Sequence, residues 1–168
     1  MKLIKLTRGQ HALVDDDMCE ELIEFTWCAQ WSPITKSFYA VRAGRKSDGL
    51  LYRKHISMHR VIMDASKGMQ VDHIDHNTLD NRRSNLRLCT TAQNAMNRGV
   101  SISNTSGYKG VGWDKVNTKW KAYIRVNTKL LHLGYFNSKN DAVRVWNLAA
   151  RMYHGEFAYT NEIKEIKG

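Results

Sequence analysis

The feature that most constrains the fold is a polar segment near the middle of the chain, VDHIDHNTLDNRRSNLRLCTTAQNAMN, which spans residues 71–97. It combines carboxylates, imidazoles, amides and guanidinium groups with few apolar side chains. A segment of a hydrophobic core does not have this composition, because each buried polar group there needs a hydrogen-bonding partner. The segment therefore indicates a chemical site carried by short elements of secondary structure.

Local patterns divide this segment into two strands and a helix. We predict a strand at 71–74, a loop at 75–85 that is rich in Asn and Asp, and a return strand at 86–89. Thr90 and Gln93 match the S/T-x-x-Q capping box, so a helix is predicted to begin at Thr90.

This arrangement brings together side chains that suit binding a metal ion, accepting a proton and binding phosphate. Asn94 lies in the first turn of the predicted helix, and the two strands bring it close to Asp72. A carboxylate and an amide oxygen suit a hard cation such as Mg²⁺. A neutral imidazole, here His73, can take a proton from an attacking water near pH 7. Guanidinium groups suited to phosphate oxygens are those of Arg82, Arg83 and Arg87. A purely structural polar loop is the alternative.

The spaced pattern of Asp-His, Asp-Asn-Arg-x-x-Asn-Leu-Arg and Thr-x-x-Gln-Asn resembles the HNH endonuclease motif. It most closely resembles the HNH homing endonucleases of bacteriophages, which have the ββα-metal fold. The resemblance implies that Asp72 and Asn94 bind one divalent ion, Mg²⁺ or Mn²⁺. It also implies that His73 is the general base and that Asn85 braces the hairpin. Asn94 stands where many members have a histidine.

Several members of that family flank the motif with cysteine pairs that hold zinc. The chain has three cysteines, at positions 19, 28 and 89, and no Cys-x-x-Cys pair. We therefore expect neither a structural zinc nor a disulfide framework.

The segment before the motif, residues 1–58, is predicted to be a β-rich lead-in. A short helix is expected at 20–25, with the acid run 15–17 on a solvated face near its start. The expected strands and turns of the lead-in are a strand at 38–41, a hairpin turn at 47–49 and a strand near 50–52.

Residues 56–63 are predicted to run helically into the motif, with His59 and Arg60 on this helix. These two side chains could touch phosphate. A structural histidine is at least as well supported, so we leave His59 out of the catalytic set.

The C-terminal part reads as a separate module after a polar linker, RGVSISNTS, at residues 98–106. Strands are predicted at 108–113, 120–126 and 130–134, followed by a helix that Ser138 caps and Gly155 ends.

This module resembles the APETALA2/ethylene-response-factor DNA-binding domain, through Tyr-Lys-Gly-Val-Gly, Trp-Lys-Ala-Tyr-Ile-Arg and Leu-Gly-Tyr-Phe. The resemblance implies that an exposed sheet face enters the DNA major groove. The corresponding outward residues are Lys109, Trp113, Lys121, Tyr123, Arg125 and His132. Plant members carry Arg at the position of Gly112 and often Glu at that of Tyr123, so their base preferences are not transferred. A solvated sheet face is the alternative.

The distribution of charge agrees with a polyanionic partner. The net charge is +10, and residues 98–168 hold 12 basic against 5 acidic side chains. Basic ribosomal and membrane-surface proteins share this property, so charge alone does not identify the partner. No apolar run approaches the roughly 20 residues that span a bilayer, and the N-terminus lacks a secretory signal. We expect a cytoplasmic protein, in the host cell if a phage encodes it.

Together these patterns predict an α+β chain with a ββα-metal HNH core and a C-terminal three-stranded antiparallel sheet with one packed helix. The expected domains are an HNH domain at 1–97, with its motif at 59–97, a linker at 98–106 and a DNA-binding domain at 107–160. The expected function is that of a metal-dependent homing-type DNA endonuclease, a monomer on double-stranded DNA with no membrane partner and no small-molecule cofactor. The alternatives are a DNA-binding protein with a decayed nuclease motif and an HNH nuclease of restriction or packaging type.

Overall fold

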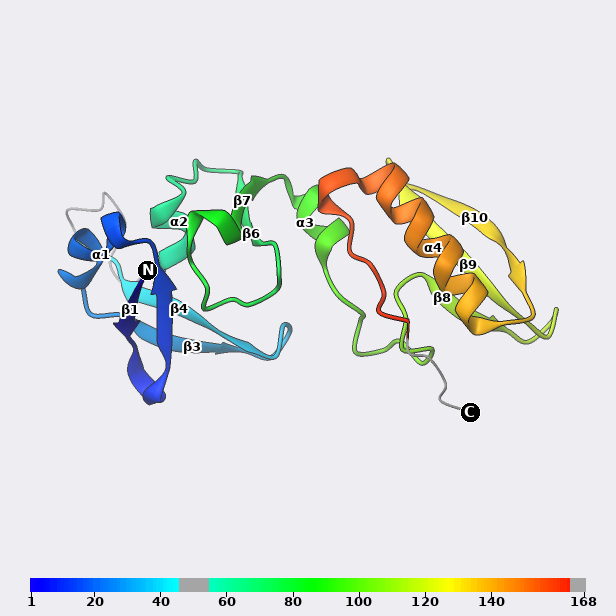
Figure 1. Cartoon of the computed structure of the whole chain (residues 1–168), viewed down its shortest axis with the longest axis horizontal. Helices are drawn as coiled ribbons and strands as arrows, with labels where there is room; N and C mark the ends of the chain where they lie inside the picture. The colour runs from blue at the N-terminus through cyan, green and yellow to red at the C-terminus, as the bar shows by residue number, and fades with distance from the viewer. Residues whose placement is uncertain (46–54, 164–168) are drawn as a thin grey trace. The chain divides into compact units, whose positions relative to one another are not determined.

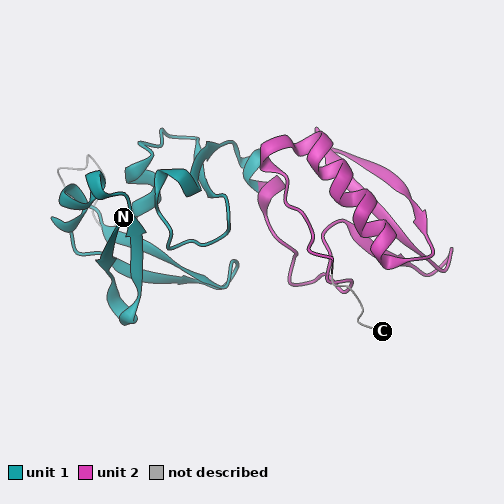
Figure 2. Cartoon of the chain, in the orientation of Figure 1, with its two compact units in different colours: residues 1–94 teal, residues 95–168 magenta. Residues whose placement is uncertain are grey.

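The computed structural model describes residues 1–45 and 55–163. The chain has a mixed α/β fold with several small antiparallel sheets and few helices (Figure 1). It divides into two compact units, residues 1–94 and residues 95–168 (Figure 2), each with its own hydrophobic core. The turn predicted at 47–49 and the strand near 50–52 lie outside the described residues. No helix in the described part of the chain is long and apolar enough to cross a membrane.

The described part of the first unit is built from short strands and short helices. Its elements in chain order are β1 (Lys2–Lys5), β2 (His11–Val14), α1 (Asp16–Ile23), β3 (Cys28–Ser32), β4 (Ser37–Ala43), β5 (His55–Ser57), α2 (Met58–Ile62), β6 (Gln70–His73) and β7 (Leu86–Cys89). The sheets are the pair β1–β2, the three strands β3–β4–β5 and the pair β6–β7, all antiparallel. Helix α3 (Thr91–Asn97) spans the boundary between the units.

Two expectations for the lead-in need correction. Helix α1 begins at Asp16, earlier than predicted, because carboxylates at the start of a helix are favoured by its dipole and the acid run supplies them. The helix predicted over 56–63 begins only at Met58. Residues 55–57 are instead strand β5, because they pair with the end of β4, where Val41 lies opposite Ser57. The strand predicted at 38–41 is confirmed within β4.

One core joins the lead-in to the hairpin of the motif. Leu22 and Trp27 are fully buried in it, and Nε1 of Trp27 donates a hydrogen bond to the carbonyl oxygen of Leu22 at 2.8 Å. Met58 of α2 and Leu86 of β7 belong to the same cluster. The lead-in therefore shares its hydrophobic core with α2 and β7, which carry parts of the motif.

The second unit is a three-stranded antiparallel sheet with one long helix (Figure 1). Its elements are β8 (Val111–Asp114), β9 (Lys119–Val126), β10 (Lys129–Phe136) and α4 (Lys139–His154), with β9 in the centre of the sheet. Ser138 caps α4 by accepting a hydrogen bond from the backbone N–H of Asp141, and α4 ends before Gly155, which has φ 55°. The core of this unit joins Ala122 and Ile124 of the sheet to Val143, Trp146 and Ala150 of the helix.

The segment between the motif and β8 is tied to the second unit. The hydroxyl of Ser106 donates to the carbonyl oxygen of Val111 at 2.6 Å, and the ammonium of Lys139 donates to that of Ser106 at 3.0 Å. At the other end of the segment, Lys109 donates to the carbonyl oxygen of Arg98 at 2.6 Å. A linker between two functional domains at 98–106 stays a prediction.

Gly110 offers a sharp test of the packing in the second unit. It has φ 70°, and a Cβ added there would lie 1.8 Å from Nε1 of Trp146, which donates to the carbonyl oxygen of Tyr123 at 3.0 Å. We expect Gly110→Ala to lower the free energy of unfolding by about 3 kcal/mol or more, because it adds left-handed backbone strain to an overpacked core.

Thermal unfolding followed by circular dichroism measures this effect, with Gly112→Ala as the control. At Gly112 an added Cβ meets no heavy atom of the described residues within 4 Å, apart from its chain neighbours. Equal melting temperatures for the two variants would show that the contact between Gly110 and Trp146 does not limit the stability of the unit.

Candidate active site

The predicted site is built on the antiparallel pair of β6 and β7. In its register Asp72 lies opposite Arg87, and His73 lies opposite Leu86. Successive residues of a strand point to opposite faces of a sheet, so Asp72 and His73 face different sides of the hairpin. The adjacent residues therefore belong to two separate environments.

On one side of the hairpin, Asp72 is paired with Arg87. Nε and Nη2 of Arg87 donate to Oδ2 of Asp72 at 2.9 and 2.6 Å. The side chains of Asp72 and Arg87 are 8% and 11% exposed. A buried carboxylate is strongly unfavourable unless a counter-charge accompanies it. Arg87 supplies that counter-charge.

Helix α3 brings Asn94 to the same side of the hairpin. The predicted capping box is confirmed, because the backbone N–H of Thr90 donates to Oε1 of Gln93 at 2.8 Å and the N–H of Gln93 donates to Oγ1 of Thr90 at 3.2 Å. Nδ2 of Asn94 then donates to Oε1 of Gln70 at 2.5 Å. Gln70 and Asp72 are two positions apart on β6 and share a face. Three side chains with oxygen atoms thus gather there, and sequence reasoning did not identify Gln70.

On the other side, the ring of His73 is buried and held by an amide. Nε2 of His73 lies 3.4 Å from Oδ1 of Asn81, which is itself fully buried. Nδ2 of Asn81 donates to the carbonyl oxygen of Leu79 at 3.2 Å, which orients the amide with its oxygen toward the imidazole. An amide oxygen only accepts hydrogen bonds, so Nε2 of His73 carries the proton and Nδ1 carries the lone pair.

The electrostatics of His73 favour its neutral form. Burial lowers the pKa of His73 below its usual value, while the hydrogen bond to Asn81 and the nearby carboxylates, led by Asp72, oppose the shift. The net direction is downward. The imidazole is therefore neutral at pH 7, as a general base must be.

Two further rings pack against His73. The ring of His59, from α2, lies 5.1 Å from that of His73 at an interplanar angle of 81°, and the ring of Tyr39, from β4, lies 6.1 Å away. Burial lowers the pKa of His59 to about 3, with smaller effects from the neighbouring His73 and Arg60. His59 is thus a neutral ring against the predicted base. The only sign in the sequence that His59 belongs to the site was its position just before the motif.

Asn85 connects the two ends of the polar loop. Its Oδ1 accepts from the backbone N–H of Asp75 at 3.1 Å, and its Nδ2 donates to the carbonyl oxygen of Asp80 at 3.0 Å. Its own carbonyl oxygen accepts from the N–H of Ile74 at 2.9 Å. These bonds hold the loop between β6 and β7, and a part for Asn85 in catalysis stays a prediction.

The segment that carries these side chains also matches known proteins. Residues 58–96, which contain α2, β6, β7 and most of α3, match the family model described as HNH endonuclease. The chain is also 35% identical over 94 residues to Protein 3.8 of Escherichia phage T7, an alignment that covers 55% of this chain and 75% of that protein. The chain belongs to the HNH endonuclease family.

A second viral relative shares a smaller part of its length. The chain is 38% identical over 93 residues to the protein named Uncharacterized HNH endonuclease L560 of Acanthamoeba polyphaga mimivirus. This alignment covers 55% of the chain but only 47% of the mimivirus protein. The chain therefore spans about half the length of that relative.

HNH endonucleases generally use a divalent metal ion, and the donors on the Asp72 side of β6 fit one. A hard cation such as Mg²⁺ takes one or two carboxylates and completes its shell with water and substrate oxygens. Asp72 offers the carboxylate, while Asn94 and Gln70 offer amide oxygens. Among the described residues, no group of three or more His, Cys, Asp or Glu side chains could hold a metal. A site of one carboxylate and amides has a different composition from such a group.

Arg82 and Arg83, expected to bind phosphate, are each paired with a carboxylate. Nη2 of Arg82 lies 2.5 Å from Oδ2 of Asp80, and Nη1 of Arg83 lies 2.6 Å from Oδ2 of Asp17. The bonds from Arg82 lower the pKa of Asp80 below its usual value. Arg83 also donates its backbone N–H to Asp15 at 2.8 Å. The loop of the motif is therefore fastened to the start of α1.

Arg60 is another basic side chain that is held by backbone carbonyl oxygens. Its Nη1 donates to the carbonyl oxygen of Met69 at 2.7 Å, and its Nη2 donates to those of Ala65 and Ser66 at 2.9 and 3.2 Å. These bonds shape the connection from α2 to β6.

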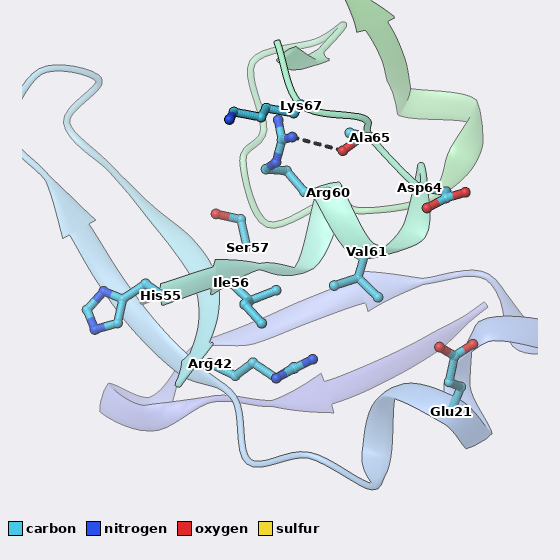
Figure 3. Close-up of a pocket in the computed structure, with 10 residues that line it drawn as sticks. All are labelled: Glu21, Arg42, His55, Ile56, Ser57, Arg60, Val61, Asp64, Ala65 and Lys67. Carbon is cyan, nitrogen blue, oxygen red and sulfur yellow. Dashed lines mark hydrogen bonds between the residues drawn. The ribbon is translucent and has the colours of Figure 1, made fainter. Parts of the chain in front are cut away.

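A pocket of about 770 Å³ lies beside Arg60 (Figure 3). Its other lining residues are Glu21, Arg42, His55, Ile56, Ser57, Val61, Asp64, Ala65 and Lys67.

In the second unit, four of the predicted DNA-contacting residues share the outer face of the sheet. Lys121, Tyr123 and Arg125 alternate along β9 with the buried residues Ala122 and Ile124. The fourth is His132, which lies opposite Tyr123 in the neighbouring strand. Residues directly opposite each other in an antiparallel pair point to the same face.

The predicted outward orientation of Trp113 is wrong. Trp113 lies opposite Trp120, with ring centroids 5.2 Å apart, and shares a face with Val111, which belongs to the core under α4. The alternating pattern of β8 therefore places Gly112 and Asp114 outward. Trp113 remains 48% exposed on the helix side of the sheet.

Lys109 does not lie in the sheet beside the other residues predicted to contact DNA. Strand β8 begins at Val111, so Lys109 lies in the preceding turn. Its ammonium donates to the carbonyl oxygens of Ala95, Met96 and Arg98 at 3.2, 2.7 and 2.6 Å, at the C-terminal end of α3. Burial, with a smaller effect of Arg98, lowers the pKa of Lys109 to about 8. Lys109 is thus a cap for α3.

Proposed function

We propose that this chain is a metal-dependent DNA endonuclease of the homing type, with β6, β7 and α3 as a ββα-metal site. The observation that carries the proposal is that adjacent residues at the end of β6 supply two different chemistries. Asp72 offers a carboxylate beside amide side chains, and His73 offers a buried, neutral imidazole. Phosphodiester hydrolysis needs these two chemistries beside one phosphate.

Asp72 and Asn94 hold one Mg²⁺ or Mn²⁺ through their side-chain oxygens in this proposal. When bound, the ion offsets negative charge on the scissile phosphate and on the leaving 3′ oxygen. His73 takes a proton from the attacking water at Nδ1, because Asn81 holds the proton on Nε2. Asn85 keeps the loop in place, and no structural zinc or other cofactor takes part.

The second unit, in the same proposal, binds double-stranded DNA through the outer face of its sheet, as in the APETALA2/ethylene-response-factor domains that it resembles. Lys121, Tyr123, Arg125 and His132 share that face, and the excess of basic side chains in residues 98–168 supports a polyanionic partner. The chain acts as a monomer on DNA.

The test is cleavage of supercoiled plasmid by the purified full chain in Mg²⁺ and in EDTA. We expect nicked or linear DNA in Mg²⁺ and uncut DNA in EDTA. Tight DNA binding without cleavage in either Mg²⁺ or Mn²⁺ would instead favour a DNA-binding protein that has lost nuclease activity.

Replacing Arg125 tests whether the outer face of the sheet recognises the DNA sequence. Arg125 is exposed, and its Nη1 donates to the carbonyl oxygen of Thr128 at 2.8 Å. We expect Arg125→Ala to lose about 10-fold in affinity for a duplex selected from a random pool, and less for random DNA, because a base contact contributes ~1–3 kcal/mol of discrimination.

Fluorescence anisotropy on both duplexes at several salt concentrations makes this measurement. Arg151→Ala, at an exposed position on α4, is the matched control and should bind both duplexes normally. Equal losses on the two duplexes, together with a shallower salt dependence, would show that Arg125 contacts phosphate alone.

A further inference from the structure

The carboxylate of Asp72 has two competing partners. In the structure it binds Arg87, and in the proposed function it binds a divalent ion. Two donors of Arg87 bind the same oxygen of Asp72, Oδ2, with Nε at 2.9 Å and Nη2 at 2.6 Å. An ion that approaches this carboxylate therefore meets a guanidinium group that is already bound to it.

The pair is largely shielded from water. Asp72 and Arg87 occupy directly opposite positions on β6 and β7, and their side chains are 8% and 11% exposed. In such surroundings a charge without a counter-charge is strongly unfavourable, and two cations beside one carboxylate repel each other more than they do in water. Arg87 therefore stabilises Asp72 when no ion is present and opposes the binding of an ion.

A DNA phosphate changes this balance. A guanidinium group binds phosphate oxygens through paired donors, as it binds a carboxylate. When a phosphate enters beside Asp72, Arg87 can exchange the carboxylate for the phosphate, and the ion then meets Asp72 without a competing cation. Every buried charge stays paired throughout this exchange.

We propose that Arg87 exchanges Asp72 for a DNA phosphate when the metal ion binds, so that metal and DNA bind cooperatively. The inference rests on the proposed role of Asp72 as a metal ligand. Because the coupling is reciprocal, DNA raises the affinity for the ion by the same factor as the ion raises the affinity for DNA. The free protein binds the ion weakly, and the site is completed on DNA.

The test is isothermal titration of the full chain with Mn²⁺, without DNA and with a short duplex. The parent protein carries His73→Ala so that the duplex stays intact. Without DNA, Arg87→Gln should bind Mn²⁺ more tightly than the parent by about 5- to 150-fold, the usual range for coupled sites. Adding the duplex should then raise the Mn²⁺ affinity of the Arg87→Gln variant by a smaller factor than it raises the Mn²⁺ affinity of the parent.

Arg144→Gln is the matched control, because Arg144 pairs with Asp141 at 2.8 Å on α4 and should not affect Mn²⁺ binding. Arg87→Met covers the case in which Arg87→Gln does not fold. It removes the competing charge and keeps a long side chain, so it should also bind Mn²⁺ more tightly than the parent.

Either of two results would show that Arg87 does not exchange Asp72 for a DNA phosphate. The second would also contradict the proposed metal site. Equal or weaker Mn²⁺ binding by both Arg87 variants, with loss of binding in Asp72→Asn, shows that Arg87 only positions a genuine metal ligand. Mn²⁺ binding by Asp72→Asn that matches the parent shows that the proposed metal site itself is wrong.

Discussion

His73→Ala should cut DNA about 10²–10⁴-fold more slowly than the wild type and bind it equally well, because a general base contributes to the rate of the chemical step and little to ground-state affinity. His73 is the buried, neutral imidazole whose proton Asn81 holds on Nε2. Single-turnover cleavage at saturating enzyme gives the rate, and fluorescence anisotropy in EDTA gives the affinity.

His76→Asn is the matched control for this experiment. His76 is exposed in the loop of the same motif and has φ 68°, a conformation that Asn tolerates well. This variant should cleave at nearly the wild-type rate. Cleavage by His73→Ala at that same rate would remove His73 from the mechanism.

Asp72→Asn should lose about 10³-fold in cleavage rate at moderate Mg²⁺, because the ion contributes several kcal/mol of transition-state stabilisation and the variant removes its one charged ligand. Asn94→Ala should lose less, since an amide offers a cation only a dipole. Cleavage rates over a range of Mg²⁺ concentrations measure both effects, with the exposed Asp75→Asn as the control. Metal dependence identical to wild type in both variants would contradict the proposed ligands.

The local pattern of the motif was sufficient to predict its elements. The strand–loop–strand order, the Thr90–Gln93 capping box and the first-turn position of Asn94 depend on residues close together in sequence. Such short-range signals are read directly from side-chain chemistry. The cap at Ser138 and the end of α4 before Gly155 were predictable for the same reason.

Features that depend on pairing between distant residues were missed. β5 exists because residues 55–57 pair with β4, and the orientation of Trp113 follows from its register against Trp120. Within one isolated strand, either set of alternate residues can face the core, and only the neighbouring strand decides between them. The position of Lys109 depends in the same way on the end of α3.

The surroundings of the site residues were the least predictable part. The motif supplies Asp72 and His73, but their partners come from other elements or from opposite positions in the hairpin. His59 reaches His73 from α2, and Gln70 meets Asn94 from the other end of β6. Arg87 and Arg83 pair with carboxylates that are distant in sequence, Asp72 and Asp17, so short-range patterns could not predict these two pairs.

The most direct test of a metal-dependent nuclease site separates binding from chemistry. The full chain is bound to a labelled duplex in EDTA, excess Mg²⁺ is added, and the product is followed by rapid quenching. The proposed mechanism predicts intact DNA until Mg²⁺ arrives and rapid product formation afterwards. Asp72→Asn and His73→Ala should remain bound and form product at least about 10²-fold more slowly. Product formed before Mg²⁺ is added, or wild-type rates from either variant, would contradict the proposed site.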